Sequence, residues 1–341
     1  MAVISGRAMQ VSEPGGPLTQ VRVDTPDPGP GQVRVAVEAC GVCHSDADIL
    51  AGHFPGVSFP VIVGHEIGGR IESTGTGVDG WLPGDRVAVG WYGGSDGYCD
   101  ACREGDGINC PHVQVPGIAY PGGYADAIVV PSAALARIPD GLTAVQAAPL
   151  ACAGVSVFNA LRDSEASPGD LVAILGLGGL GHLGVQFAAH MGFVTAAIAR
   201  GAGKADLARR LGAHHYIDSV ATDPAKALQD FGGAKVVLAT VPDGPAMSAI
   251  VDGLGRRGEL IVIGVTADQV TASGLQFIMG AKRIAGQASG TSMDTEHALR
   301  FAADTGVLPW IEETPLDQAQ VAFDKMLSGK ARFRMVLTTG G

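Results

Sequence analysis

Three closely spaced cysteines form the most regular group of potential metal ligands in the sequence. Cys99 and Cys102 are separated by two residues, Cys110 follows after seven more, and Asp96 stands three positions before Cys99. Three thiolates and one further ligand make a closed tetrahedral zinc site, which would tie a loop together. The spacing therefore predicts structural zinc. Three free thiols on an irregular loop are the alternative, because a carboxylate is a less usual ligand in such sites.

A second set of candidate metal ligands is dispersed along the chain. Cys43 lies in ACGVCHSD, His65 in VGHE and Cys152 in PLACAG. Two thiolates and one imidazole would leave the fourth position of a zinc ion open, and an open zinc ion polarises an alcohol oxygen. Asp46 is placed to accept a hydrogen bond from the other ring nitrogen of His65. Taken singly, Cys152 also fits a small buried apolar residue and His65 a core histidine, and the spacing alone does not join them.

A glycine-rich motif, GLGGLG, indicates a nucleotide site. It follows an expected strand at 171–175 and precedes an expected helix that begins near 182. In this arrangement the first glycine permits a tight turn, the second lets the backbone approach a pyrophosphate, and the third allows close packing of helix on strand. The helix N-terminus offers free N–H groups to the phosphates. The alternative is an ordinary tight turn. The residues expected to bind the cofactor here are Gly176, Gly178, Gly179, Leu180 and Gly181.

The end of the following strand bears on which dinucleotide binds. An acidic residue there would accept the ribose hydroxyls of NAD, whereas an arginine suits the 2′-phosphate of NADP. Ala199 occupies the acidic position, with Arg200 beside it and Lys204 nearby. The sequence therefore favours NADP(H) over NAD(H), and a solvated pair at a helix start is the alternative for the two basic residues.

The elements that must position these residues fall into two patterns. Residues 1–148 contain short alternating segments between glycine and proline turns, which is typical of a mostly-β domain. From 149 to 289 short apolar strands alternate with helical segments, which predicts a doubly wound parallel sheet. After about 289 the pattern loosens, and 331–337 resembles a final strand. We expect residues 290–341 to belong with the first domain.

Composition excludes several classes of partner. The 341 residues carry a formal net charge of −11 and no extended basic run, which argues against nucleic acid and anionic membrane surfaces. No apolar run approaches the roughly 20 residues of a membrane span, and the N-terminus does not resemble a signal peptide. We expect a cytoplasmic protein, whose six cysteines serve metal binding or catalysis rather than disulfides.

Taken together, these motifs resemble those of the zinc-dependent medium-chain alcohol dehydrogenase family. The resemblance covers essentially the whole chain and rests on motifs in the family's order: GVCHSD (41–46), GHE (64–66), the cysteine cluster (99–110), CAGV (152–155) and GLGGLG (176–181). It implies a GroES-like, mostly-β catalytic domain and a doubly wound Rossmann dinucleotide-binding domain. It also implies that Cys43, His65 and Cys152 bind a catalytic zinc ion, with Glu66 approaching as an alternate ligand.

The resemblance implies further roles. Ser45 would hydrogen-bond the bound alcohol and begin a proton relay, because a hydroxyl accepts one proton while donating another. His44 would lie at the cofactor pyrophosphate or pass the proton outward, and Arg334 would contact the cofactor phosphates. Phe54 and Trp91 match positions that line the substrate pocket, with ordinary core aromatics as the alternative.

Three residues depart from the family's pattern. Many relatives have a cysteine where Asp96 stands, which puts the structural zinc in doubt. Asp48 replaces a histidine of the relay in many members, so the last proton step would use His44, ribose or water. Ala199 replaces the acidic residue of NAD-dependent members. None of the three affects the catalytic zinc ligands.

The function that follows is hydride transfer between an alcohol or aldehyde and NAD(P). A zinc-independent NADPH quinone or enone reductase is the alternative enzyme, and a non-catalytic nucleotide-binding protein of the same fold is the alternative from another class. Neither alternative needs Cys43, His65 and Cys152 together. The family resemblance further implies a homodimer or homotetramer.

Overall fold

The computed structural model describes residues 4–340. They form two compact units, the first comprising the residues up to Val155 and those from Ser289 on, and the second comprising Ser156–Ala288. The residues from Ser289 on therefore pack with the residues up to Val155, although the second unit lies between them in the sequence. Each unit has its own sheet.

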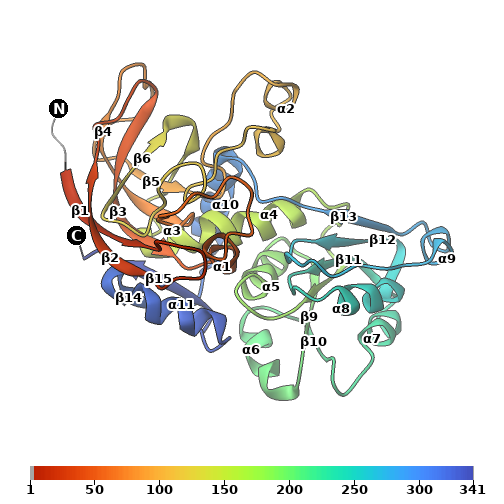
Figure 1. Ribbon diagram of the computed structural model, residues 1–341. Coiled ribbons are helices and arrows are strands. Elements are labelled where there is room, and N and C mark those ends of the chain that lie inside the picture. The colour runs from red at the N-terminus through yellow and green to blue at the C-terminus, as the bar shows by residue number, and fades with distance from the viewer. Residues whose placement is uncertain (1–3, 341) are drawn as a thin grey trace. The chain divides into compact units, whose positions relative to one another are not determined.

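The first unit is built mostly of strands. A seven-stranded sheet has the order β14-β15-β3-β4-β5-β7, with β6 also paired to β3, and β1 and β2 form a separate antiparallel pair (Figure 1). Its strands are β1 (Ile4–Gln10), β2 (Thr19–Thr25), β3 (Gln32–Gly41), β4 (Ile67–Thr74), β5 (Arg86–Val89), β6 (Ala127–Pro131), β7 (Leu135–Arg137), β14 (Ile311–Pro315) and β15 (Arg334–Thr338). Its helices are α1 (His44–Leu50), α2 (Asp100–Arg103), α3 (Ala144–Pro149), α10 (Ser292–Thr305) and α11 (Ala319–Leu327).

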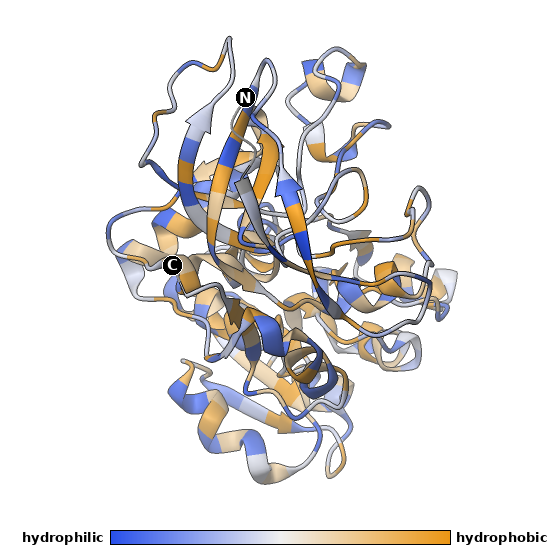
Figure 2. Ribbon diagram, turned by 60° about the vertical axis from the view of Figure 1, so that its left-hand side comes forward, coloured by the Kyte–Doolittle hydropathy of each residue, from blue (hydrophilic) through white to orange (hydrophobic). Residues whose placement is uncertain are grey.

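The core of this unit follows from alternating strand residues. Figure 2 shows hydrophobic and hydrophilic residues alternating along strands near the N-terminus, as expected where one face of a strand is buried. Val33, Val35 and Val37 of β3 are buried in one cluster with Ile67 and Ile71 of β4. Strand β3 is central in the sheet, because it pairs with β4, β6 and β15, and Cys43 follows its last residue by two positions.

The second unit is a parallel sheet of six strands in the order β10-β9-β8-β11-β12-β13 (Figure 1). Its strands are β8 (Leu171–Leu175), β9 (Val194–Ala199), β10 (His215–Asp218), β11 (Ala234–Ala239), β12 (Leu254–Val262) and β13 (Arg283–Gly286). Its helices are α4 (Val155–Arg162), α5 (Gly181–His190), α6 (Ala205–Arg210), α7 (Pro224–Asp230), α8 (Gly244–Ala249) and α9 (Gly274–Ile278). The order reverses between β8 and β11, so the predicted doubly wound fold is confirmed.

Two local features are not evident from the sequence pattern. The segment after residue 289, where the pattern loosens, contains α10, which begins with a capping box of Thr291 and Asp294 and is followed by Gly306, whose φ of 79° is left-handed. Strand β4 starts only at Ile67. Residues 62–64 instead hydrogen-bond to the loop at 122–124, which leaves His65 and Glu66 just outside the sheet.

One continuous helical segment, Ala144–Arg162, is long and apolar enough to cross a membrane by length and composition, with a mean hydropathy of 1.5. It is 19 residues long, close to the expected length of a membrane span. The same test is passed by core helices, and 78 % of its most apolar window is buried. We therefore treat it as a core helix.

Candidate functional site

The dispersed candidate ligands converge in the first unit. The thiol sulfurs of Cys43 and Cys152, a ring nitrogen of His65 and a carboxylate oxygen of Glu66 all lie within 4.8 Å of one another. Cys43 precedes α1, His65 and Glu66 precede β4, and Cys152 lies in a π-helical turn. His65 and Glu66 are fully buried, and Cys43 is nearly so. The fold therefore brings together four residues that are up to 109 positions apart in sequence (152 − 43).

Cys152 lies in a π-helical turn, η3 (Leu150–Gly154). It joins α3 to α4 without a break in the helix, so the chain holds wider i→i+5 geometry for one turn between two α-helical stretches. Such turns occur mostly as single insertions and often at functional sites. Here the turn carries Cys152, whose sulfur lies within 4.8 Å of the sulfur of Cys43.

The environment of His65 fits a metal ligand. Its Nδ1 lies 3.1 Å from Oδ1 of Asp46, and both side chains are fully buried. This contact has the distance of an ion pair but not the geometry of a hydrogen bond. Its Nε2 is buried and has no hydrogen-bond partner among the residues that the structure describes. A buried ring nitrogen facing two thiols and lacking a partner is the arrangement that zinc would complete.

The charges and hydrogen bonds around the thiols also fit a metal site. The hydrogen bond from Cys152 and the neighbouring His65 lower the pKa of Cys43 well below its usual range. Burial opposes a charge on His65, but the carboxylate of Asp46 and the sulfur of Cys43 outweigh it and raise the His65 pKa. The lowered pKa favours the thiolate form of Cys43, which is the form that binds a metal.

Glu66 and Arg334 form a buried ion pair in which Arg334 Nη2 donates to Glu66 Oε1. Burial raises the pKa of Glu66, and the charge of Arg334 opposes that shift. The second carboxylate oxygen, Oε2, is buried without a hydrogen-bond partner among the described residues. The structure thus places Arg334 against Glu66, while its predicted contact with cofactor phosphates stays a prediction.

Two aromatic rings flank the site. The Trp91 ring meets the His65 ring edge-on, with centroids 4.9 Å apart, and Phe54 lies 5.5 Å from Trp91. Both side chains are only partly buried. They form an apolar wall beside the candidate ligands.

The residues predicted for proton transfer lie in the first turns of α1. His44 is exposed and Ser45 is partly buried. Asp48, one turn along, lies 3.4 Å from the exposed ring of His53. The helix therefore runs from the buried ligand Cys43 to exposed polar side chains.

The second predicted cluster is also assembled, in the loop that carries α2 and extends away from the sheet (Figure 1). The sulfurs of Cys99, Cys102 and Cys110 and an oxygen of Asp96 lie within 4.8 Å of one another. Oδ1 of Asp96 accepts hydrogen bonds from the backbone of Tyr98 and Cys99, which lower the Asp96 pKa. Its Oδ2 is buried without a hydrogen-bond partner among the described residues, so it is available as the fourth ligand.

The glycine motif of the second unit has the geometry that its three roles require. Gly176 has a φ of 103°, a conformation that favours glycine. A Cβ on Gly181 would lie 1.9 Å from the carbonyl oxygen of Gly176, whereas a Cβ on Gly178 would meet nothing within 4 Å. The third glycine therefore permits close packing, and the second leaves open space for a ligand. Gly179 and Leu180 complete the turn before α5, whose N-cap residue makes no side-chain capping bond.

Beyond β9 the chain carries the two basic residues of the cofactor prediction. Arg200 is exposed, and Lys204 Nζ donates to the carbonyl of Leu177 in the glycine loop at 3.0 Å. The backbone N–H of Gly201 donates to Asp218 Oδ1 at 2.7 Å, which fixes the loop to β10. Arg200 is therefore available to a ligand at the end of β9.

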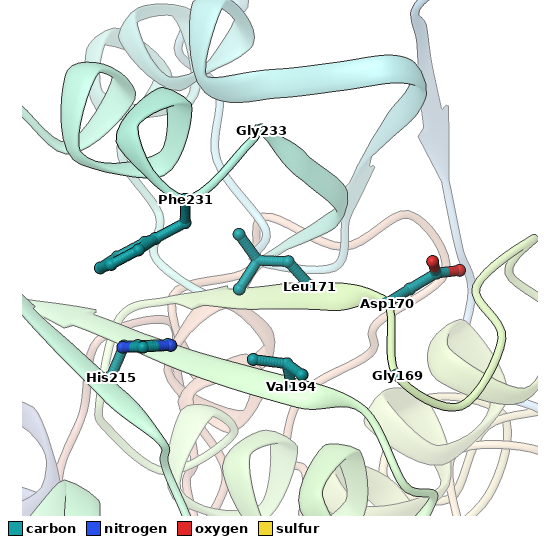
Figure 3. A pocket seen from close by; sticks show the side chains of 7 residues that line it. All are labelled: Gly169, Asp170, Leu171, Val194, His215, Phe231 and Gly233. Atoms are coloured by element: carbon teal, nitrogen blue, oxygen red, sulfur yellow. The ribbon is translucent and has the colours of Figure 1, made fainter.

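Two hollows in the second unit lie at opposite ends of its strands. A hollow of about 400 Å³ lies beside Val262, Gly264 and Gly286, at the carboxyl ends of β12 and β13. Another, of about 300 Å³, lies at the amino ends of the strands, away from the glycine loop (Figure 3). His215, its only imidazole, stacks on Phe231. We assign no function to that second hollow.

Tyr124 belongs to the site although its sequence gives no such indication. Its hydroxyl donates to Asp46 Oδ2 at 3.0 Å, and the side chain is fully buried. It lies 78 positions after Asp46 in a segment without metal ligands, so no spacing rule links the two. Only the tertiary structure identifies it.

Comparison with known proteins places this fold and site in a class. Residues 29–140 match the family described as the alcohol dehydrogenase GroES-like domain, and residues 179–304 match the zinc-binding dehydrogenases. An alcohol dehydrogenase, patD, from Penicillium expansum is 42 % identical over 96 % of this chain and 95 % of its own. The chain belongs to the medium-chain alcohol dehydrogenase family, and it is an alcohol dehydrogenase.

Solved structures agree with this membership. The cinnamyl alcohol dehydrogenase SbCAD4 of Sorghum bicolor is similar with a TM-score of 0.91 at 28 % identity, covering 99 % of this chain and 98 % of that one. A CAD from Helicobacter pylori, complexed with NADP(H), has a TM-score of 0.88 at 26 % identity, covering 99 % of each chain. The GroES-like and Rossmann domains predicted from the sequence are therefore confirmed.

Proposed function

We propose that this alcohol dehydrogenase holds catalytic zinc with Cys43, His65 and Cys152, and that Glu66 serves as an alternate ligand. The observation that carries the proposal is the buried, unpartnered Nε2 of His65 facing two thiols. Zinc bound there would supply a Lewis acid that polarises the oxygen of an alcohol or aldehyde, while the dinucleotide exchanges the hydride. The family membership supports the same ligands.

In this proposal the chain's own side chains manage the proton and the substrate. Ser45 accepts the alcohol proton and hands it along α1 toward the exposed ring of His44 and water. Asp46 orients His65. The rings of Trp91 and Phe54 contact the substrate's carbon skeleton, which favours an apolar alcohol over a charged one.

We also propose a closed structural zinc site of Asp96, Cys99, Cys102 and Cys110. Its support is the unpartnered Oδ2 of Asp96 together with backbone N–H groups that point at sulfur, from Cys102 to Cys99 at 3.5 Å and from His112 to Cys110 at 3.3 Å. All ligand atoms come from one short loop, so zinc would tie that loop together without contacting substrate.

For the cofactor we propose a preference for NADP(H), with its pyrophosphate at the GLGGLG turn and its 2′-phosphate at Arg200. The support is Ala199 in place of an acid, the exposed guanidinium of Arg200 and the open space beside Gly178. Lys204 is committed to the Leu177 carbonyl and so contributes mainly its charge. Initial rates with NADPH and NADH compare the two cofactors directly.

The assembly we propose is a homodimer or homotetramer. Among the described residues β13 is the last strand in its sheet, and beside it the apolar side chains of Leu275, Ile278 and Met279 are 68 %, 78 % and 64 % exposed. An unpaired strand edge next to exposed apolar side chains is a surface that a second copy would cover. We propose the cytoplasm as the compartment, since all six cysteines are free thiols.

The test of the catalytic site compares two buried cysteines three residues apart. Cys43→Ala should lose one zinc ion per chain and lower kcat for aldehyde reduction by at least about a thousandfold, because a metal ligand and the polarising charge are lost together. Cys40→Ala is the matched control, because Cys40 is equally buried but lies outside the ligand group, and it should keep its metal. Full activity in the Cys43→Ala protein would refute the proposal.

A further inference from the structure

The fully buried Tyr124 makes a hydrogen bond that the proposed reaction does not use. Its hydroxyl donates to Oδ2 of Asp46 at 3.0 Å, and neither side chain is exposed to solvent. A buried carboxylate is costly unless its lone pairs are satisfied. The partners of this carboxylate therefore determine how it is held.

The Asp46 carboxylate has three partners in the structure. Oδ2 accepts from the Tyr124 hydroxyl and from the backbone N–H of Cys43 at 2.9 Å, whereas Oδ1 faces Nδ1 of His65 at 3.1 Å. One oxygen is thus anchored by two donors and the other is directed at the candidate ligand. Because a carboxylate is planar, fixing Oδ2 also fixes the direction of Oδ1.

The backbone of Tyr124 is tied to the segment that precedes His65. Its N–H donates to the carbonyl of Val63 at 2.9 Å, and the N–H of Gly123 donates to Gly64 at 2.8 Å. A Cβ on Gly64 would lie 2.5 Å from the Tyr124 ring, so glycine is needed for the ring to lie this close. The same residue therefore contacts both Asp46 and the chain that carries His65.

We propose that Tyr124 is a positioning residue of the metal site, which holds Asp46 and thereby fixes the orientation of His65 toward the metal. The inference rests on the proposed function, because it requires a metal at Nε2 of His65. Burial and the neighbouring Asp46 raise the pKa of Tyr124 well above its usual value, so its hydroxyl stays protonated and donates throughout the range of ordinary assays.

The direct test is Tyr124→Phe, which removes the hydroxyl and keeps the ring. Competition with a chelator should show zinc binding weakened by about tenfold, the lower end of the range for partners of metal-ligating histidines. The loss should be confined to one of the metal ions, and kcat per bound catalytic zinc should change less than occupancy does. An unchanged affinity would overturn the inference.

A matched control separates this role from the general loss of a buried tyrosine hydroxyl. Tyr120 donates its hydroxyl to the carbonyl of Gly93 at 2.7 Å and does not contact Asp46. Tyr120→Phe should leave zinc affinity within about twofold of the wild type. If both variants weaken zinc equally, the effect is structural and the inference fails.

A double-mutant cycle tests whether Tyr124 acts through Asp46. Asp46→Asn alone should weaken zinc by about 10–100-fold, and adding Tyr124→Phe should weaken it by less than about twofold more, because the link is already broken. Independent, multiplying effects would show that Tyr124 acts by another route and would overturn the inference.

Two further outcomes have separate meanings: a Tyr124→Phe protein that does not fold, and a wild-type protein that binds no zinc. If Tyr124→Phe does not fold, 4-fluorophenylalanine at the same position fills the volume of the hydroxyl without donating a hydrogen bond. This variant should give the same weakening of zinc binding by about tenfold. Zinc affinity equal to that of the wild type would overturn the inference. If the wild-type protein itself binds no zinc after reconstitution, the proposed function fails first, and the inference fails with it.

Discussion

At the scale of single residues, the two candidate metal sites share one feature that a sequence does not show. Each contains a buried polar atom without a hydrogen-bond partner among the described residues, Nε2 of His65 in one and Oδ2 of Asp96 in the other, within a group that includes cysteine sulfurs. The other carboxylate oxygen of Asp96, Oδ1, accepts hydrogen bonds from the backbone N–H groups of Tyr98 and Cys99. In the proposed structural site, one oxygen of Asp96 would order the loop and the other would bind the metal.

A residue-scale prediction concerns Asp218, which connects the cofactor loop to β10. Hydrogen bonds from the backbone of Val220 and Gly201 lower its pKa in the folded chain below the value of about 3.9 in an unfolded one. A lowered pKa stabilises the fold above about pH 4, and this contribution is lost as the pH falls through the folded-state pKa. Asp218→Asn should lower the unfolding temperature at pH 7, and the difference from wild type should disappear in strong acid.

The control for this prediction is Asp230→Asn. Asp230 is exposed at the end of α7, so its replacement should change the unfolding temperature little. Thermal unfolding followed by circular dichroism between about pH 1.5 and pH 8 measures both variants. A destabilisation by Asp218→Asn that persists unchanged into acid would contradict the proposed electrostatic cause.

At the scale of elements, two glycines in the turn between β8 and α5 should affect different properties, one the binding of the cofactor and the other the stability of the fold. Gly178→Ala adds a Cβ that meets nothing in the protein, so stability should be kept while the KM for NADPH rises on the order of tenfold, because the methyl group occupies space for the pyrophosphate. Gly181→Ala places a Cβ 1.9 Å from the Gly176 carbonyl and should cost about 1–3 kcal/mol of stability. Denaturant unfolding and steady-state kinetics on both variants test the pair, and equal loss of stability would contradict it.

An element can be predicted from the sequence where the residues that determine it lie close together in the chain. The strands of the second unit follow from apolar runs bounded by glycine, and the role of GLGGLG follows from its place between strand and helix. The start of helix α10 has a local signal, because Thr291 and Asp294 form a capping box. The apolar pattern along the helix is weak, so the sequence does not show the rest of it clearly. The π-helical turn at Cys152 and the bond from Tyr124 to Asp46 depend on packing between distant segments, so no local pattern reports them.

At the scale of the whole molecule, the proposed assembly makes the exposed side chains beside β13 an interface. Ile278→Glu would place a charge in it and should weaken self-association by at least about a hundredfold. Val220→Glu is the matched control, since Val220 is 74 % exposed but follows β10, at the opposite edge of the sheet. Sedimentation velocity should show smaller particles only for Ile278→Glu, and unchanged assembly in both variants would argue against this surface.

The measurement that tests the central claim most directly is the zinc content per chain of the purified protein, taken together with initial rates of benzaldehyde reduction. The account predicts two zinc ions per chain and turnover that is faster with NADPH than with NADH. One zinc ion with activity would keep the catalytic site and remove the structural one. No zinc after reconstitution, with no turnover on either cofactor, would contradict the claim that Cys43, His65 and Cys152 form a catalytic metal site.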